Sequence, residues 1–518
     1  MEQPTLAQPT LSLAAPKSLI KRKYTDGALH SGSSGGKKAA AGEQTGADYR
    51  TPFMRDRDRV LYCTAFRRLA GKTQIYTIGN DDHRRNRLTH TLEVAQIART
   101  IACALQLDCD LAEAIALAHD LGHTPFGHAG EKVLHKIMSP QSPVIQNSPL
   151  FKCSLEDLKA RVTKERPSKK FDINKMMGFK HNLQSVRVAT VLEDSYRDEK
   201  GHNIGLGLTN YTLWGMMNHS ALQYADDSFA PNYQNQFFEQ MTFPDSAVEA
   251  WSLEAYVVKI ADDIAQCHHD LEDALRGDAM STKKIHTTLS SALNGIVNKE
   301  DKEILKTLKN PKVVDRKYTA SLSHVVVNSL VSDVVSASRK KMDLLRQQLR
   351  EKNGEIEDLF LNYDKYNKYI EISEEKEKDS NKKTVEKSIP KNEVICFSKK
   401  EIIKDIKIGI QKFVHHSQAV ERMNGKGDYI IRKIFEAYCS HPQQLPDGPI
   451  IHYMVEIGKY KNIDIAKATG RGEIRKRFGE DLETMTAVKQ LALMRRICDH
   501  IASMTDHYAI NEYNSLYG

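Results

Sequence analysis

The chain lacks any apolar run approaching the roughly 18–20 residues that a membrane span needs. Its N-terminus also lacks the apolar core of a signal peptide. The eight cysteines (positions 63, 103, 109, 153, 267, 396, 439 and 498) contain no Cys-x-x-Cys pair, so the sequence offers no zinc-ribbon or thioredoxin-type motif. We therefore expect a cytoplasmic protein with free thiols and no membrane partner.

The net positive charge is also small for a nucleic-acid-binding protein. The net charge is +8 over 518 residues, and +3 of it lies in residues 1–50. Nucleic-acid binding is therefore a secondary expectation. The arginines instead gather at residues 55–68 and 84–87, and such clusters suit a polyanionic substrate because each guanidinium can bind phosphate oxygens in pairs. A solvated basic face is the alternative for any single arginine.

The composition, 40% hydrophobic and 27% charged, is ordinary for one large domain or two fused ones. Apolar periodicity predicts a mainly α fold with three parts: a disordered tail at residues 1–48, a helical core at 49–275 with an insertion at about 139–177, and a helical C-terminal part at 276–518. The last part holds a charged loop at about 373–393. The apolar runs 369–372 and 394–397 beside this loop can pair as a small β-hairpin.

One stretch, residues 117–131, is rich in metal-binding side chains. His119 and Asp120 directly follow an apolar helical run, and His123, His128 and Glu131 come within eleven residues of Asp120. Imidazoles and carboxylates suit a divalent metal with open positions, and Mg, Mn, Co and Fe all tolerate them. A surface helix-loop-helix with packing histidines is the alternative.

Two distant residues complete a ligand set. His90 begins another helical pattern, and Asp262 lies on an apolar helix where an unpaired carboxylate would be costly to bury. We therefore expect His90, His119, Asp120 and Asp262 to form a two-His, two-Asp metal site without cysteine ligands.

The order His, His-Asp, Asp resembles that of HD-domain phosphohydrolases. The full set of sequence motifs resembles that of the deoxyguanosine-triphosphate triphosphohydrolases and related dNTPases over about residues 50–275 and 400–515. The matching motifs are RTPF at 50–53, AFRRL with KTQ at 65–74, HDLGHTPFGHAGE at 119–131, GFKHNLQSVR at 178–187, ADDIA at 261–265 and ASMTD at 502–506. The resemblance implies an HD-domain helical fold for residues 49–275.

The resemblance also implies cleavage between the α-phosphorus and the 5′-oxygen of a dNTP, with dGTP favoured, releasing the deoxynucleoside and intact triphosphate. His128 and Glu131 lie three residues apart and so share a helix face. Their family counterparts carry catalysis, and a carboxylate beside an imidazole is expected to raise its pKa for proton donation. His123 and His181 are expected to support the reaction or face phosphate; a packed, structural histidine is the alternative at 181.

The family-matched substrate contacts are Gln74 and Asp270 for the sugar and Arg87 for phosphate, with Asn182 as a further contact. Three departures leave base preference and a nucleotide effector open: Gln266 stands where relatives usually carry an aromatic, Ser503 replaces a glycine, and His507 replaces an arginine. The resemblance further implies a homo-oligomer, with a hexamer as one form.

Two other classes of function remain. Another HD phosphohydrolase or phosphodiesterase would share the metal ligands but would have no need for the Arg67-Arg68 and Lys72-Thr73-Gln74 motifs. A nucleic-acid-binding or scaffold protein with a vestigial site would not need the complete set of ligands together with His128 and Glu131.

Overall fold

The computed structural model describes residues 50–74, 85–139, 142, 160–161, 164–165, 178–197, 203–220, 252–276, 281–308, 316–351, 371–372, 387–388, 393–399, 401–411, 414, 416–460 and 469–518. The predicted disordered tail lies outside the described residues, as do most of the predicted insertion and most of the charged loop.

The described chain is mostly helical, which confirms the predicted fold class. The helices are α2 (Pro52–Tyr62), α3 (Thr64–Arg68), η1 (Leu69–Gly71), α4 (Arg87–Ala104), α5 (Cys109–Ala118), α6 (Gly127–Ile137), α9 (His181–Arg187), η3 (Val188–Leu192), α10 (Asn210–Asn218), α12 (Leu253–Arg276), α13 (Thr282–Ala292), α14 (Lys299–Thr307), α15 (Arg316–Glu351), α18 (Ile402–Ile406), η5 (Lys407–Gln411), α20 (Gln418–Ser440), η6 (Pro442–Gln444), α21 (Asp447–Glu456), α23 (Arg471–Glu483), α24 (Ala487–Ser503) and α25 (Asp506–Tyr517).

Helix α5 is the centre of the larger half of the molecule. Asp108 caps its N-terminus by accepting hydrogen bonds from the backbone of Asp110 and Leu111. The helix is rich in alanine and buried on almost every face, because α2, α4, α10 and α12 pack against it. Short side chains let these helices approach closely, so the residues at the end of α5 enter the protein interior.

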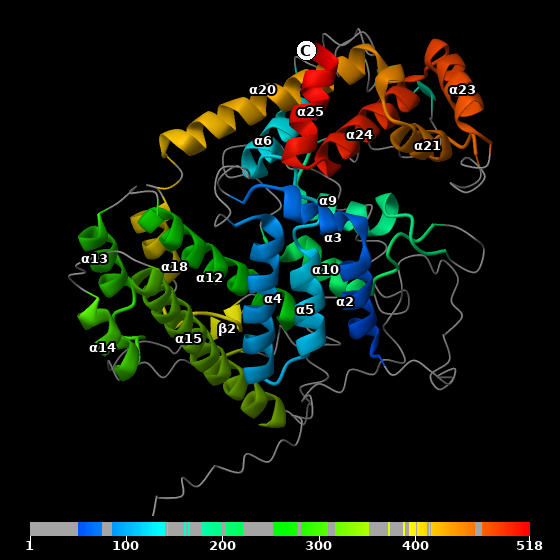
Figure 1. Cartoon of the computed structure of the whole chain (residues 1–518). Coiled ribbons are helices and arrows are strands. Elements are labelled where there is room, and N and C mark those ends of the chain that lie inside the picture. Colours follow the sequence, from blue (N-terminus) through cyan, green and yellow to red (C-terminus); the bar gives the residue numbers. More distant parts are fainter. Residues whose placement is uncertain are drawn as a thin grey trace, which may run out of the picture.

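The buried side chains form two hydrophobic clusters. The first surrounds α5 and extends through α12, α13 and α15. The second joins α6 with α20, α21, α23, α24 and α25, which lie together at the C-terminal end of the molecule (Figure 1). Between α5 and α6, residues 119–126 cross from one cluster to the other. The predicted metal-binding stretch therefore lies at this junction. The division of the chain at residue 275 stays a prediction.

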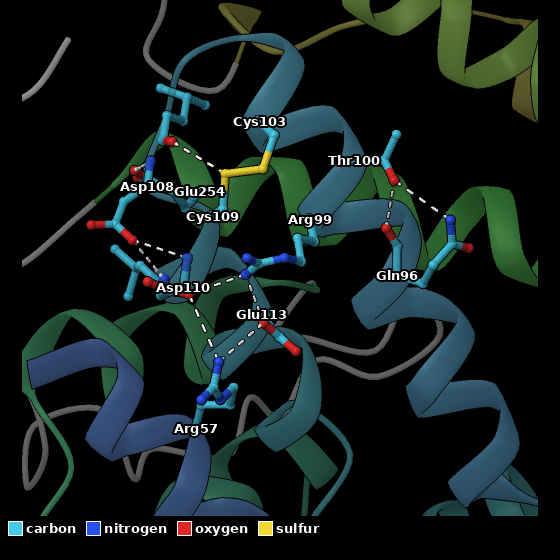
Figure 2. The surroundings of a disulfide bond; sticks show 12 residues. Arg57, Gln96, Arg99, Thr100, Cys103, Asp108, Cys109, Asp110, Glu113 and Glu254 are labelled. Carbon is cyan, nitrogen blue, oxygen red and sulfur yellow. Dashed lines mark hydrogen bonds and ion pairs between the residues drawn. A yellow bond between two sulfur atoms is a disulfide. The ribbon is translucent and has the colours of Figure 1, made fainter. Parts of the chain in front are cut away.

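The cysteine prediction was wrong at one pair. Cys103, near the end of α4, and Cys109, which begins α5, form a disulfide across a Cα–Cα distance of 5.5 Å (Figure 2). The two helices meet at a tight connection, so residues six apart in sequence come within bonding range. Five described cysteines are free, at positions 63, 267, 396, 439 and 498; Cys153 lies outside the described residues. Cysteine usage therefore no longer argues for a reducing compartment.

A small hairpin is present, but with a different second strand. β1 (Glu371–Ile372) pairs antiparallel with β2 (Lys387–Ser388), not with residues 394–397. Val394 and Ile395 are buried instead, and the Cys396 backbone N–H donates to the Ser338 hydroxyl on α15. Burial against α15 therefore takes the place of strand pairing there.

Helix α15 contains a segment, Lys317–Leu345, that is long and apolar enough to cross a membrane by length and composition alone. It packs against α12 and α4, and its apolar residues belong to the first cluster. Of the apolar window, 44% is buried inside the structure.

Candidate metal centre and active site

His119 is the C-terminal cap of α5 and is almost fully buried. Its Nδ1 donates to the carbonyl of Ala116 at 2.6 Å, so its Nε2 is the unprotonated nitrogen. That Nε2 is buried and has no hydrogen-bond partner among the described residues. A buried lone pair without a partner is costly unless a cation accepts it.

Two neighbouring helices bring further ligands to His119. His90 lies in the first turn of α4 and Asp262 on α12, and their ligand atoms lie within 4.8 Å of each other and of His119. The His90 Nε2 is 3.0 Å from an oxygen of Asp262. The Asp120 carboxylate is 3.3 Å from the free nitrogen of His119. The structure therefore brings His90, His119 and Asp262 together, with Asp120 next to His119, and their role as metal ligands stays a prediction.

Both aspartates are held ionised. Burial alone would raise the pKa of Asp120, but the His119 and His123 imidazoles and the Arg87 guanidinium hold it well below its usual value. Burial opposes the ionisation of Asp262 too, and its hydrogen bond with His90 prevails and lowers its pKa. The ligand atoms of His90, His119 and Asp262, with Asp120 next to His119, fit a divalent metal ion.

Arg87 opens α4 and forms a buried ion pair with Asp120, at 2.8 Å. Its Nε and Nη2 are buried without hydrogen-bond partners among the described residues. Gly127 has φ +60°, and a Cβ there would lie 3.3 Å from that Nη2. The glycine thus leaves space beside the unpartnered face of the guanidinium.

The turn between α5 and α6 depends on close contacts with other segments. A side chain at Gly122 would clash with the backbone of α9, with a Cβ only 2.2 Å from the Ser185 nitrogen. Phe126, which precedes α6, has φ +59°, and its N–H donates to Asp506 at 2.9 Å. Because left-handed backbone is unfavourable outside glycine, this bond helps to hold the turn that starts α6.

Glu131 on α6 organises two histidines. Its Oε2 accepts from His128 Nδ1 at 3.1 Å, and its Oε1 accepts from His181 Nδ1 at 2.9 Å and from the His181 backbone at 3.0 Å. The Lys180 ammonium is 3.3 Å away. The predicted pairing of His128 with Glu131 therefore exists, and His181 joins it from 50 residues further on.

The expected rise in the pKa of His128 is wrong. Surrounding protein atoms partly desolvate the charged ring and lower its pKa, and this outweighs the raising effect of Glu131. The side chain is nevertheless 59% exposed, so a substrate can reach it. Burial likewise lowers the pKa of His123, whose Nε2 is 3.1 Å from Asp120 and whose ring stacks on that of His181.

The remaining predicted substrate contacts are spread around this centre. Gln74 has a buried amide oxygen without a partner among the described residues. Asn182 is fully buried, and its amide nitrogen donates to the Met217 carbonyl of α10, so that group already serves the fold. Asp270 is buried on α12, two turns after Asp262. Their roles stay predictions.

Three residues were missed by the sequence analysis. Buried His219, at the end of α10, has a ligand atom within 4.8 Å of those of Asp120 and His181. His269 and Glu93 extend from His90, as described below. Gln266, noted only as a departure from the family, donates its amide N–H to both oxygens of Asp262, at 3.0 and 3.1 Å. His219 directly follows α10 and His269 lies in the run His268-His269-Asp270, and neither has a spacing that marks a metal site.

Comparison with known proteins agrees with this geometry. Residues 87–149 match the HD domain, and residues 467–515 match the phosphohydrolase-associated domain. Several relatives are named deoxyguanosinetriphosphate triphosphohydrolase-like protein. That of Bartonella henselae is 29% identical over 97% of this chain and 98% of its own length. Those of Bartonella tribocorum and Roseobacter denitrificans are each 30% identical over 90% of this chain, and over 90% and 91% of their own lengths.

The fold and the site thus define an HD-domain phosphohydrolase. Within that class, the chain belongs to the deoxyguanosinetriphosphate triphosphohydrolase-like family, as the match along nine-tenths of both chains shows.

Proposed function

We propose that the chain hydrolyses deoxynucleoside triphosphates, dGTP first among them, to the deoxynucleoside and inorganic triphosphate. The observation that carries the proposal is the buried Nε2 of His119, which makes no hydrogen bond to the described residues and lies beside His90, Asp120 and Asp262, together with Arg87 nitrogens that likewise make none. His90, His119, Asp120 and Asp262 would hold a divalent cation, which would polarise a phosphate oxygen and stabilise negative charge developing on phosphorus.

The residues around these ligands divide the remaining work. Arg87 keeps one nitrogen on Asp120 and turns the others to phosphate oxygens, which fixes the polyphosphate next to the ligands. Water adds to the α-phosphorus and gives up one proton to the solvent as the bond from phosphorus to the 5′-oxygen breaks. His128 gives the departing oxygen its proton from Nε2, since its Nδ1 is bound to Glu131. The charge of bound triphosphate raises the pKa of His128 and so opposes the effect of burial.

Sugar recognition is assigned to Gln74 and Asp270. A site built to bond a 3′-hydroxyl rejects analogues without it more strongly than an apolar pocket can. Replacement of the usual aromatic by Gln266 weakens stacking on the sugar, because this amide is turned to Asp262. The homo-oligomer, the nucleotide effector and the cytoplasmic location stay predictions.

Product analysis tests the proposal. The chain is incubated with Mn²⁺ and each of the four dNTPs, and the products are separated by anion exchange. Inorganic triphosphate with deoxynucleoside is the expected outcome. Pyrophosphate or monophosphate would instead assign the chain to another reaction of HD enzymes. Values of kcat/KM for dGTP, GTP and dideoxy-GTP then test the sugar contacts: equal values would remove the assignment of Gln74 and Asp270.

A further inference from the structure

A chain of hydrogen bonds leads away from His90 on the side opposite Asp262. The Nδ1 of His90 faces the Nδ1 of His269 at 3.3 Å, and the Nε2 of His269 lies 2.5 Å from the Glu93 carboxylate. His90 and His269 are each 1% exposed. Glu93 follows His90 by one turn on α4, whereas His269 comes from α12, so packing of the two helices makes the contact.

The carboxylate sets the direction of both hydrogen bonds. Glu93 also accepts a hydrogen bond from Arg85 at 3.0 Å and lies 3.3 Å from His268, so its oxygens act as acceptors. His269 must therefore carry its proton on Nε2, which leaves a lone pair on its Nδ1. That lone pair accepts the Nδ1 proton of His90. The Nε2 of His90 is then the nitrogen left to bind a metal, and it lies 3.0 Å from an Asp262 oxygen. A cation bound there would replace the proton of the hydrogen bond between His90 and Asp262.

We propose that His269, held by Glu93, is a positioning residue for the metal centre that fixes His90 in its metal-binding tautomer. The inference rests on the proposed metal centre but not on the identity of the substrate. Groups that orient a metal-binding histidine typically contribute about 10–100-fold to metal affinity or activity.

The second histidine ligand provides an internal comparison. The proton on Nδ1 of His119 goes to a backbone carbonyl, that of Ala116, which no side-chain substitution removes. The tautomer of His90 depends on side chains alone. The effect of substituting His269 should therefore reach the metal through one ligand only, and should weaken binding without abolishing it.

The test is Mn²⁺ affinity of the full-length chain, measured by isothermal titration calorimetry and by the EPR signal of free Mn²⁺. His269→Leu removes the acceptor and should weaken binding 10–100-fold. His269→Asn places an amide oxygen where Nδ1 stood and should recover a large part of that loss. Glu93→Gln removes the charge that orients His269 and should fall between these two. Glu272→Gln, which removes a carboxylate on α12 that pairs with Arg85 and His268 but not with His269, is the matched control and should bind as wild type.

Melting temperatures in EDTA show whether each variant folds. If His269→Leu does not fold, His269→Asn and Glu93→Gln still decide the matter. Wild-type Mn²⁺ affinity in Glu93→Gln, or an equal loss in the Leu and Asn variants, would overturn the proposal. Release of a product other than triphosphate from dGTP by the wild type would refute the proposed substrate chemistry. It would leave the order of metal affinities intact.

Discussion

Replacing Glu131 by glutamine tests the proton-transfer assignment without changing side-chain size. The carboxylate is 1% exposed. One of its oxygens accepts a hydrogen bond from His128. The other accepts two hydrogen bonds from His181 and lies near the Lys180 ammonium. A glutamine has one oxygen and one NH₂ group for these donors. The oxygen should stay with His181 and Lys180, where more donors meet, so the NH₂ faces Nδ1 of His128.

The magnitude follows from that orientation. Facing an NH₂ group, His128 must leave its Nδ1 unprotonated, and it loses the negative charge that supports its imidazolium form. Loss of a positioned general acid costs about 10²–10⁴ in rate, and an amide in place of the aspartate of a serine-protease triad costs about 10⁴. We expect kcat to fall by about 10²–10⁴. Because His128 is largely exposed and can bond to water, stability should fall by only about 1–2 kcal/mol.

The assay is steady-state release of triphosphate from dGTP, with Mn²⁺ affinity and urea unfolding measured in parallel. KM and Mn²⁺ affinity should change little, since Glu131 is not among the four proposed ligands. Glu512→Gln, which alters a carboxylate bonded to Tyr438 in the C-terminal helices, is the control. A kcat within tenfold of wild type would refute the orientation argument, and a large loss of Mn²⁺ affinity would place Glu131 with the ligands instead.

Three further predictions concern the surroundings of the site. His119→Ala should abolish both Mn²⁺ retention and hydrolysis with little change in helical circular dichroism; an active, metal-loaded variant would disprove the ligand set. Asp506→Asn turns one amide N–H toward the donors of Phe126 or Thr73, so unfolding free energy should drop by about 1–3 kcal/mol and kcat with it, as urea unfolding and kinetics will show. Burial, with the nearby arginines, lowers the pKa of Lys72 from 10.5 to about 7, so the unfolded chain binds more protons between those values and stability rises with pH there. Lys72→Met should flatten that rise between pH 7 and 9.5, and an unchanged slope would contradict it.

Three of the four proposed ligands could be picked out from the sequence because they stand out locally. His119 and Asp120 end an apolar helix, and Asp262 is an acid on another apolar helix. Such placements are costly without a partner, so the sequence itself signals a site. The pairing of His128 with Glu131 was predictable for the same local reason, since three residues on a helix share a face.

The surrounding contacts were not predictable, because they join residues far apart in the chain. His90 meets His269 across 179 positions, and Glu131 meets His181 across 50. Which nitrogen of a histidine carries the proton depends on such tertiary contacts, and no periodicity encodes it. The pKa of His128 shows the same limit: the neighbouring carboxylate is visible in the sequence, whereas the desolvation by surrounding protein atoms that outweighs it is not.

The C-terminal helices complete the site although they supply none of the proposed metal ligands. Lys72 donates to the backbone carbonyls of His123 and Ala502, and so ties the metal-binding turn to the end of α24. Asp506, at the start of α25, accepts from Phe126 in that turn and from Thr73, next to Gln74. The two regions matched as separate family domains therefore meet at one turn. The second region stabilises the strained backbone from which α6 presents His128 and Glu131. In this fold the phosphohydrolase-associated segment belongs to the proposed active site, because without it the turn would lose the Phe126–Asp506 hydrogen bond that holds its left-handed residue.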